Sequence, residues 1–167
     1  MIKFIWPFEP HYLTRDYYFQ DPLYYGGIHG AVDLVHDFDG QPGDPMVATC
    51  TGILQHNPFL DHNGGWTCWI DSDDGWRITY YHMMQPSHVP SGSRVTQGQV
   101  IGYMGATGVA MGVHLHIMFW HKVRQSPESL ARPNGWCTHD PLLRLGIDDG
   151  IVSPVVEEDD MTPEQDE

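Results

Sequence analysis

Two histidines one residue apart give the clearest chemical signal in the sequence. His114 and His116 lie in the apolar segment GVHLHIMF, residues 112–119, which is typical of a buried strand. Side chains alternate along a strand, so both imidazoles project from one face. Imidazole is the commonest neutral metal ligand, and two of them on one rigid face form half of a zinc site.

A second candidate pair lies far upstream. His29 and Asp33 occur in GIHGAVDL, residues 27–34, where the glycines disfavour a helix and favour an extended segment. His36 is an alternative ligand, although its position breaks the strand-face parity with His29. Three ligands, His29, Asp33 and His116, would leave a position on zinc for water, whose pKa zinc lowers to roughly 7. The set predicts a hydrolase.

Hydrolysis also needs groups that move protons and stabilise the oxyanion. His114 shares its strand face with His116, and His82 ends the predicted strand 76–81. We predict that His82 and His114 are the catalytic pair. The other histidines are predicted to be structural or exposed: His11, His36, His56, His62, His88, His121 and His139.

Short strand-like segments separated by turn residues dominate the pattern. They cover residues 46–54, 66–70, 76–81, 99–104 and 114–120, and DSDDG between the second and third indicates a hairpin. Helical periodicity is nearly absent, with at most one turn over 127–131. The sequence predicts an all-β fold, in which antiparallel sheets form a small sandwich or barrel-like core and long loops wall a substrate groove.

The chain of 167 residues is long enough for one domain with a real core. Residues 1–28, rich in aromatics and interrupted by prolines, are expected to form an arm packed on the domain. The catalytic domain is expected over 29–145. Residues 146–167 are expected to be an acidic, flexible tail, because 157–167 hold seven acidic residues and no Lys or Arg.

Charge and cysteine content exclude several classes of function. A net charge of −14 disfavours binding to nucleic acid or to anionic membranes. No apolar run reaches the roughly 20 residues of a membrane helix, and the N-terminus lacks the features of a secretory signal. Cys50, Cys68 and Cys137 have no CxxC spacing and are expected to be buried thiols. The chain is expected to act as a monomer.

Five motifs, in order, resemble those of the lysostaphin/LytM-type zinc metalloendopeptidases, which cut peptidoglycan peptides. HGAVD at 29–33 resembles the family's His-x-Gly-x-Asp, and YYHM at 80–83 resembles Tyr-x-His-Leu. The others are GDPMVA with GIL at 43–54, the glycine-punctuated run at 95–108, and GVHLHI at 112–117. A single HxH motif is common by chance. Five motifs in order over more than half of the chain are specific.

The resemblance implies one Zn²⁺ bound by His29, Asp33 and His116, with His82 and His114 catalytic. The implied reaction is hydrolysis of peptide bonds in stem peptides or cross-bridges of peptidoglycan.

Two departures from the family pattern are expected to alter loop geometry without removing a ligand. Ala31 stands where the family has glycine, with Gly30 one place earlier, and Val113 replaces a proline. The family also commonly has a tyrosine near the oxyanion. Tyr24 and Tyr25 are both candidates, and spacing does not decide between them.

Two other functions are alternatives to this one. One is a non-catalytic zinc-binding or regulatory module of the same fold, for example a virion structural component. The other is a zinc deaminase, which is disfavoured because the sequence lacks His-x-Glu with Pro-Cys-x-x-Cys. We find no export signal and no cationic wall-binding repeats in the sequence. In both respects the chain resembles a phage lysin or a virion-associated wall hydrolase. Such an enzyme reaches the wall from the host cytoplasm or from the virion.

Overall fold

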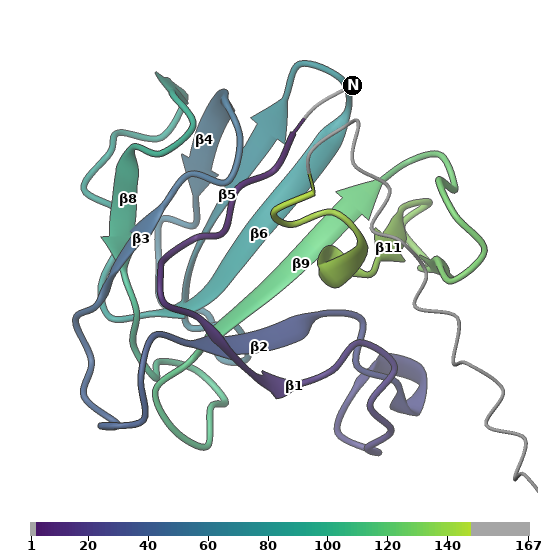
Figure 1. The fold of residues 1–167 in the computed structure, drawn as a ribbon, viewed down its shortest axis with the longest axis horizontal. Coiled ribbons are helices and arrows are strands. Elements are labelled where there is room, and N and C mark those ends of the chain that lie inside the picture. Colours follow the sequence, from purple (N-terminus) through teal and green to yellow (C-terminus); the bar gives the residue numbers. More distant parts are fainter. Residues whose placement is uncertain (1–2, 148–167) are drawn as a thin grey trace, which may run out of the picture.

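Short antiparallel strands account for most of the fold in the computed structural model, which describes residues 3–147 (Figure 1). The predicted acidic tail lies outside the described residues from position 148 onward. Within them no helix is long and apolar enough to cross a membrane. The elements are β1 (Tyr12–Arg15), η1 (Tyr25–Gly27), β2 (Val32–Val35), β3 (Pro45–Val47), β4 (Gly52–His56), β5 (Trp66–Ser72), β6 (Trp76–Met83), β7 (Ser93–Val95), β8 (Val100–Tyr103), β9 (Leu115–His121), β10 (Leu130–Ala131), β11 (Cys137–His139) and η2 (Pro141–Leu143).

One large sheet carries nine of these strands in the order β1-β2-β9-β6-β5-β4-β7, with β11 paired to β9 and β10 to β11. The strands β3 and β8 form a second sheet. Pairing between the strands is antiparallel throughout, and the large sheet does not close on itself into a barrel. The prediction of an all-β fold made of antiparallel sheets is confirmed.

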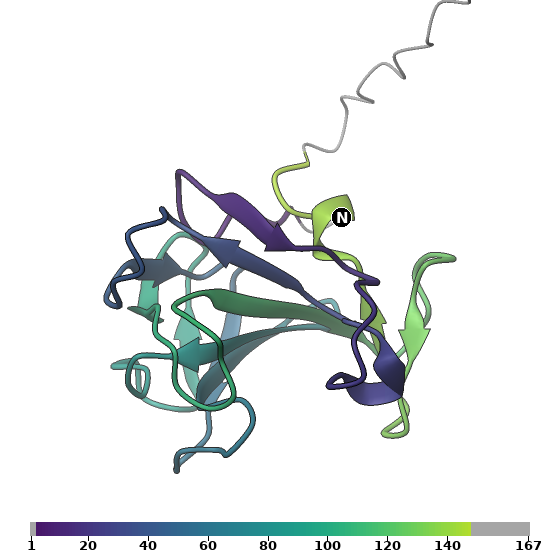
Figure 2. The same cartoon turned by 90° about the horizontal axis from the view of Figure 1, so that it is seen from below.

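The core lies on one face of the large sheet. Leu115, Ile117 and Phe119 alternate along β9, and all three side chains are fully buried. The N-terminal segment crosses this face (Figures 1 and 2). Its Phe4 ring meets Phe119 edge-on, with 4.9 Å between ring centroids. Met46 on β3 adds to the same core.

The opposite face of β9 presents the intervening residues, His116, Met118 and Trp120, which are only partly buried. Tyr81 on β6 lies directly across from His116. The alternation inferred from the sequence therefore puts His116 on the face that points away from the core, where it is accessible to a ligand.

Three local details of the structure were not foreseen in the sequence. The segment 46–54 is two strands in different sheets, because the chain turns at Ala48–Cys50 and Thr49 N donates to Tyr80 Oη at 2.9 Å. The helical turn predicted over 127–131 is wrong: Leu130 pairs with Thr138 in the β10–β11 hairpin. The N-terminal region contains the strand β1, which joins the sheet beside β2.

The cysteines are free thiols, as expected. Cys50 and Cys68 are fully buried, and burial raises the pKa of Cys50 to about 12. Cys137 is only partly buried.

Stability in acid should depend on His139, a fully buried residue on β11. Burial lowers the pKa of His139 to about 4 in the folded chain. Between about pH 6.5 and pH 4 the unfolded chain therefore binds a proton at this residue that the folded chain does not bind. The free energy of unfolding should therefore fall by about 2 kcal/mol between pH 7 and pH 5 on account of this residue. Urea unfolding of the wild type and of His139→Gln at both pH values measures the effect: the variant should lose less stability, and an equal loss would contradict the prediction.

Candidate metal centre

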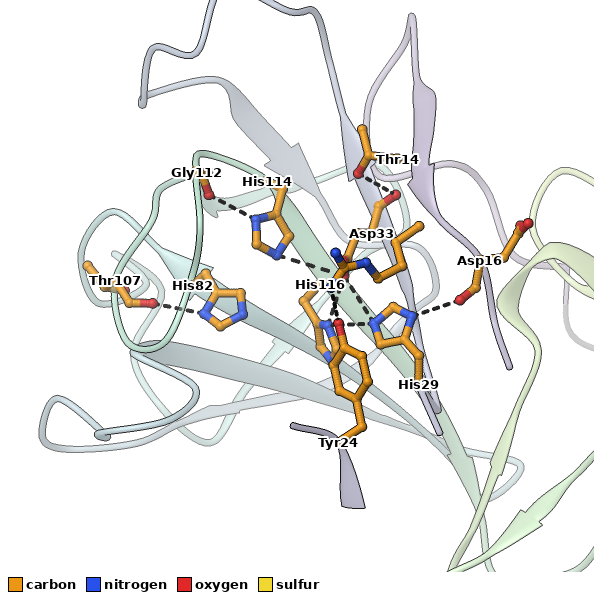
Figure 3. Close-up of polar contacts among 11 residues, drawn as sticks. Thr14, Asp16, Tyr24, His29, Asp33, His82, Thr107, Gly112, His114 and His116 are labelled. Carbon is orange, nitrogen blue, oxygen red and sulfur yellow. Dashed lines mark hydrogen bonds and ion pairs between the residues drawn. The ribbon is translucent and has the colours of Figure 1, made fainter. Parts of the chain in front are cut away.

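Three potential ligand atoms from distant parts of the chain converge on one point (Figure 3). His116 Nδ1 lies 2.8 Å from Asp33 Oδ1 and 3.1 Å from His29 Nε2. His29 Nε2 lies 3.3 Å from the same oxygen of Asp33. The structure thus brings together the three residues predicted as metal ligands.

The spacing of these atoms suits zinc. Donors on tetrahedral zinc with bonds of about 2.0 Å lie roughly 3.3 Å apart, and the three distances here run from 2.8 to 3.3 Å. Two imidazole nitrogens and one carboxylate oxygen are also donors that zinc accepts, and three protein ligands leave room for a fourth. The residues therefore fit the metal that the sequence implies.

Strand pairing explains why Asp33 meets His116. The two are direct partners in the antiparallel register of β2 and β9, and side chains of directly opposed residues lie on the same face of a sheet. His29 comes from the loop before β2, where its Nδ1–H donates to the Asp16 carbonyl at 2.8 Å. That bond fixes the tautomer and leaves the Nε2 lone pair free for a metal.

Asp33 carries the negative charge of the centre. Burial by itself would raise the pKa of Asp33, but hydrogen bonds with His116 and His29 outweigh burial and hold the pKa well below its ordinary value. Burial lowers the pKa of His116, against the opposing effect of the Asp33 charge. A carboxylate that stays ionised beside an imidazole that resists protonation is an arrangement that suits a divalent cation.

The two predicted catalytic histidines lie on the other side of His116. The ring centroids of His82 and His114 are 4.9 Å apart, and those of His82 and His116 are 5.7 Å apart. His82 Nδ1–H donates to the Thr107 carbonyl at 2.8 Å, and His114 Nδ1–H donates to the Gly112 carbonyl at 2.9 Å. Both rings thereby keep an Nε2 lone pair, and that of His114 is 3.8 Å from Asp33 Oδ1.

His82 sits in a strained backbone conformation. Its φ is +61°, in the left-handed region that side chains other than glycine rarely adopt. Its backbone N–H donates to the Gly64 carbonyl at 2.8 Å, which helps to hold that conformation. Burial lowers the pKa of His82 to about 4, so the ring is neutral at physiological pH and is able to accept a proton.

The structure places the residues that the sequence left as alternatives, namely His36 as a ligand and the two tyrosines near the oxyanion. His36 lies outside the centre, with its Nδ1 3.4 Å from Asp37 and 3.8 Å from Asp44. Of the two tyrosines, Tyr24 is beside the centre, with its ring 4.6 Å from that of His29 and its hydroxyl bonded to Arg15 (Figure 3). Tyr25 is 64% exposed.

An apolar pocket of about 360 Å³ opens next to His116. Met118 and Trp120 continue the face of β9 into it, and Arg132 from the β10–β11 hairpin lies in its wall. This pocket was not predicted from the sequence. Met118 and Trp120 follow His116 by two and four residues, so the alternation along a strand could have placed them on the same face. Nothing in the sequence indicated Arg132, because it reaches the pocket through a hairpin that is distant in the chain.

A sequence profile described as peptidase family M23 matches residues 32–127, which is more than half of the chain. The chain belongs to peptidase family M23. Its resemblance to the lysostaphin/LytM-type enzymes is thereby confirmed.

Two similar proteins illustrate the relationship. The glycyl-glycine endopeptidase ALE-1 of Staphylococcus capitis is 28% identical over 115 residues, which is 66% of this chain and 32% of ALE-1. The peptidoglycan DD-endopeptidase ShyC of Vibrio cholerae is 32% identical over 98 residues, which is 58% of this chain and 22% of ShyC. The match thus spans less than a third of either relative.

Solved structures share the fold. The catalytic domain of lysostaphin from Staphylococcus simulans aligns with a TM-score of 0.62 and 24% identity, covering 80% of this chain and 90% of that one. A mutant catalytic domain of the prophage-encoded M23 protein EnpA from Enterococcus faecalis aligns with a TM-score of 0.61 and 25% identity, covering 83% and 95%. Both alignments cover four-fifths or more of this chain and show that the fold is shared.

Proposed function

We propose that this protein is a zinc-dependent endopeptidase that hydrolyses peptide bonds in the stem peptides or cross-bridges of peptidoglycan. The observation that supports it is the set of three donor atoms of His29, Asp33 and His116, spaced 2.8–3.3 Å apart. The names of ALE-1 and ShyC, both peptidoglycan or glycyl-glycine endopeptidases, support the class of substrate.

Each residue has a role in this proposal. Zinc held by His29, Asp33 and His116 would supply a Lewis acid that polarises the scissile carbonyl and makes a water molecule more acidic. His82 is neutral, so its Nε2 accepts a proton from the attacking water and later returns it to the leaving amine. His114 has its Nε2 in the same space, 3.8 Å from Asp33 Oδ1, and after taking up a proton at this nitrogen it would donate a hydrogen bond to the developing oxyanion.

The substrate peptide would lie along the open face of β9, over His116, Met118 and Trp120. An extended peptide is the form in which a strand face and a long groove bind a chain with the least loss of entropy. Tyr24, beside His29, is placed to donate a hydrogen bond to the substrate carbonyl.

Digestion of purified sacculi tests the proposal. Sacculi with direct cross-links and sacculi with glycine bridges are incubated with the zinc-loaded protein, and mass spectrometry identifies the released fragments and the new amino termini. We expect new termini within the peptides and intact glycan strands. A protein that contains zinc but releases nothing from any sacculus would favour the non-catalytic module, which the comparisons do not favour.

Metal removal should abolish the activity reversibly. Dialysis against a chelator should lower the rate of fragment release to background, and one equivalent of Zn²⁺ per chain should restore it, because His29, Asp33 and His116 together hold one ion in this proposal. Zinc content by atomic absorption and the release rate are measured on the same samples. Full activity in a sample free of zinc would contradict zinc dependence.

Three broader predictions belong to the same proposal. A phage lysin or a virion-associated hydrolase remains the proposed context, and the bacterial cell wall the proposed place of action. The protein is proposed to act as a monomer that binds neither nucleic acid nor membrane. The division into an arm over 1–28 and a catalytic domain over 29–145 likewise remains a prediction.

A further inference from the structure

The pocket beside the metal centre contains one permanent charge. Its lining is mostly aromatic and aliphatic, with Tyr25, Met118 and Trp120 among its members, and Arg132 is the only Lys, Arg, Asp or Glu in it. His116, a proposed zinc ligand, lines the same pocket. A molecule bound at the centre and extending into this pocket therefore meets the guanidinium of Arg132.

The hydrogen-bonding capacity of Arg132 is largely unused. Its Nη1 donates to the Tyr25 carbonyl at 3.3 Å, and its Cζ lies 5.2 Å from the centroid of the Tyr25 ring. Its Nε is buried and has no hydrogen-bond partner. None of the ion pairs formed within residues 3–147 includes Arg132.

Two other arginines of the chain form paired hydrogen bonds with carboxylates. Arg77 donates two hydrogen bonds to Asp71, at 2.7 and 3.0 Å. Arg94 donates two to Asp73, at 3.1 and 2.6 Å. Carboxylates are abundant in a chain with a net charge of −14. Among residues 3–147 Arg132 forms no ion pair with any of them, so within this part of the chain its guanidinium is available for a carboxylate from outside.

The lack of a side chain at Gly30 is a second, independent indication that the fold leaves room for this guanidinium. A Cβ added at Gly30 would overlap Nη2 of Arg132. The HGAVD motif departs from the family pattern at this point, with glycine at 30 and alanine at 31. The volume occupied by Arg132 supplies a physical reason for the glycine at 30.

We propose that Arg132 binds a carboxylate of the peptide substrate and makes the protein selective for peptides that carry a free carboxylate near the cleaved bond. The inference rests on the proposed peptidoglycan endopeptidase activity. A guanidinium binds a carboxylate through two parallel hydrogen bonds, and the apolar walls strengthen the pairing by limiting access of water.

Chemical amidation of the substrate tests this selectivity. Sacculi are treated with a carbodiimide and ammonia, which converts their carboxylates to carboxamides, and the release rate is compared with that from untreated sacculi. The wild type should cleave the amidated sacculi about ten- to a hundred-fold more slowly, the usual effect of losing a charged hydrogen-bond partner. Arg132→Gln should cleave both preparations at one similar, low rate.

Two further variants separate charge from structure. Arg132→Lys keeps the charge and should retain part of the discrimination, and Gly30→Ala displaces the guanidinium and should lose it. Zinc content and melting temperature are measured for each variant, so a folding defect is recognised. If Arg132 only supports Tyr25, all variants lose activity while the ratio between the two sacculi stays at the wild-type value, and the inference is wrong.

Binding provides a readout independent of turnover. Soluble muropeptides, untreated or amidated, are titrated into the metal-free protein, and the change in tryptophan fluorescence, to which Trp120 in the pocket contributes, reports binding. The wild type should bind the untreated peptide about ten-fold more tightly, and Arg132→Gln should bind both equally. Equal cleavage and equal binding of both forms by the wild type would overturn the role of Arg132 alone, whereas no cleavage of any sacculus would overturn the proposed function with it.

Discussion

Replacing His116 with alanine is expected to remove zinc and to lower the rate of peptide release by at least about 10³-fold. His116 Nδ1 is the closest neighbour of Asp33 Oδ1, at 2.8 Å. Without it two donors remain, and zinc sites in hydrolases need three. The Lewis acid supplies several kcal/mol of stabilisation to the transition state, and each 1.36 kcal/mol corresponds to about ten-fold in rate.

The measurement is zinc content together with fragment release from sacculi. The matched control is His88→Ala, an exposed histidine outside the centre, which should keep both. Leu115, Ile117 and Phe119 hold β9 in the core from its other face, so the variant should fold. A His116→Ala protein that retains one zinc per chain would show that the ligand set is wrong.

Replacing His82 with alanine is expected to lower the turnover rate by about 10²- to 10⁴-fold while zinc stays bound, since this is the usual contribution of a positioned acid or base. The imidazole is neutral because burial lowers its pKa to about 4, and its free Nε2 faces the centre. The proton transfers are therefore lost, but none of the three closest donors is removed.

This experiment also distinguishes two ways of holding the metal. His82, His114 and His116 form a second group of possible ligands, with donor atoms within 4.8 Å of one another. If His82→Ala loses zinc as well as activity, that group holds the ion and His29 and Asp33 have another role. His62→Ala, which changes an exposed histidine in the loop before β5, is the control.

The sequence predicted those features that depend on alternation along one strand. The period-two pattern of residues 114–120 placed His116 on one face of β9 and Leu115, Ile117 and Phe119 on the other, and the structure agrees. The Asp-Gly turn between β5 and β6 was likewise predictable, because Gly75 has a φ of +92° that glycine adopts at little cost.

Features that depend on long-range pairing were not predictable from the pattern. The apolar run 46–54 looks like one strand, because nothing local shows that its two halves are buried in different sheets. The register that sets Asp33 opposite His116 joins residues far apart in the chain, and no local periodicity fixes such a register. Arg132 reached the pocket in the same way, through the pairing of β10 with β11 and of β11 with β9.

The backbone of His82 has a consequence for engineering this protein. A residue with a Cβ at φ of +61° is disfavoured relative to glycine by about 1 kcal/mol. A procedure that improves thermal tolerance by matching each residue to its local torsion angles would therefore choose glycine at position 82. Such a variant would have a higher melting temperature but would lose the proposed cell-wall hydrolysis. Histidine should therefore be kept at position 82 when thermostable variants are designed.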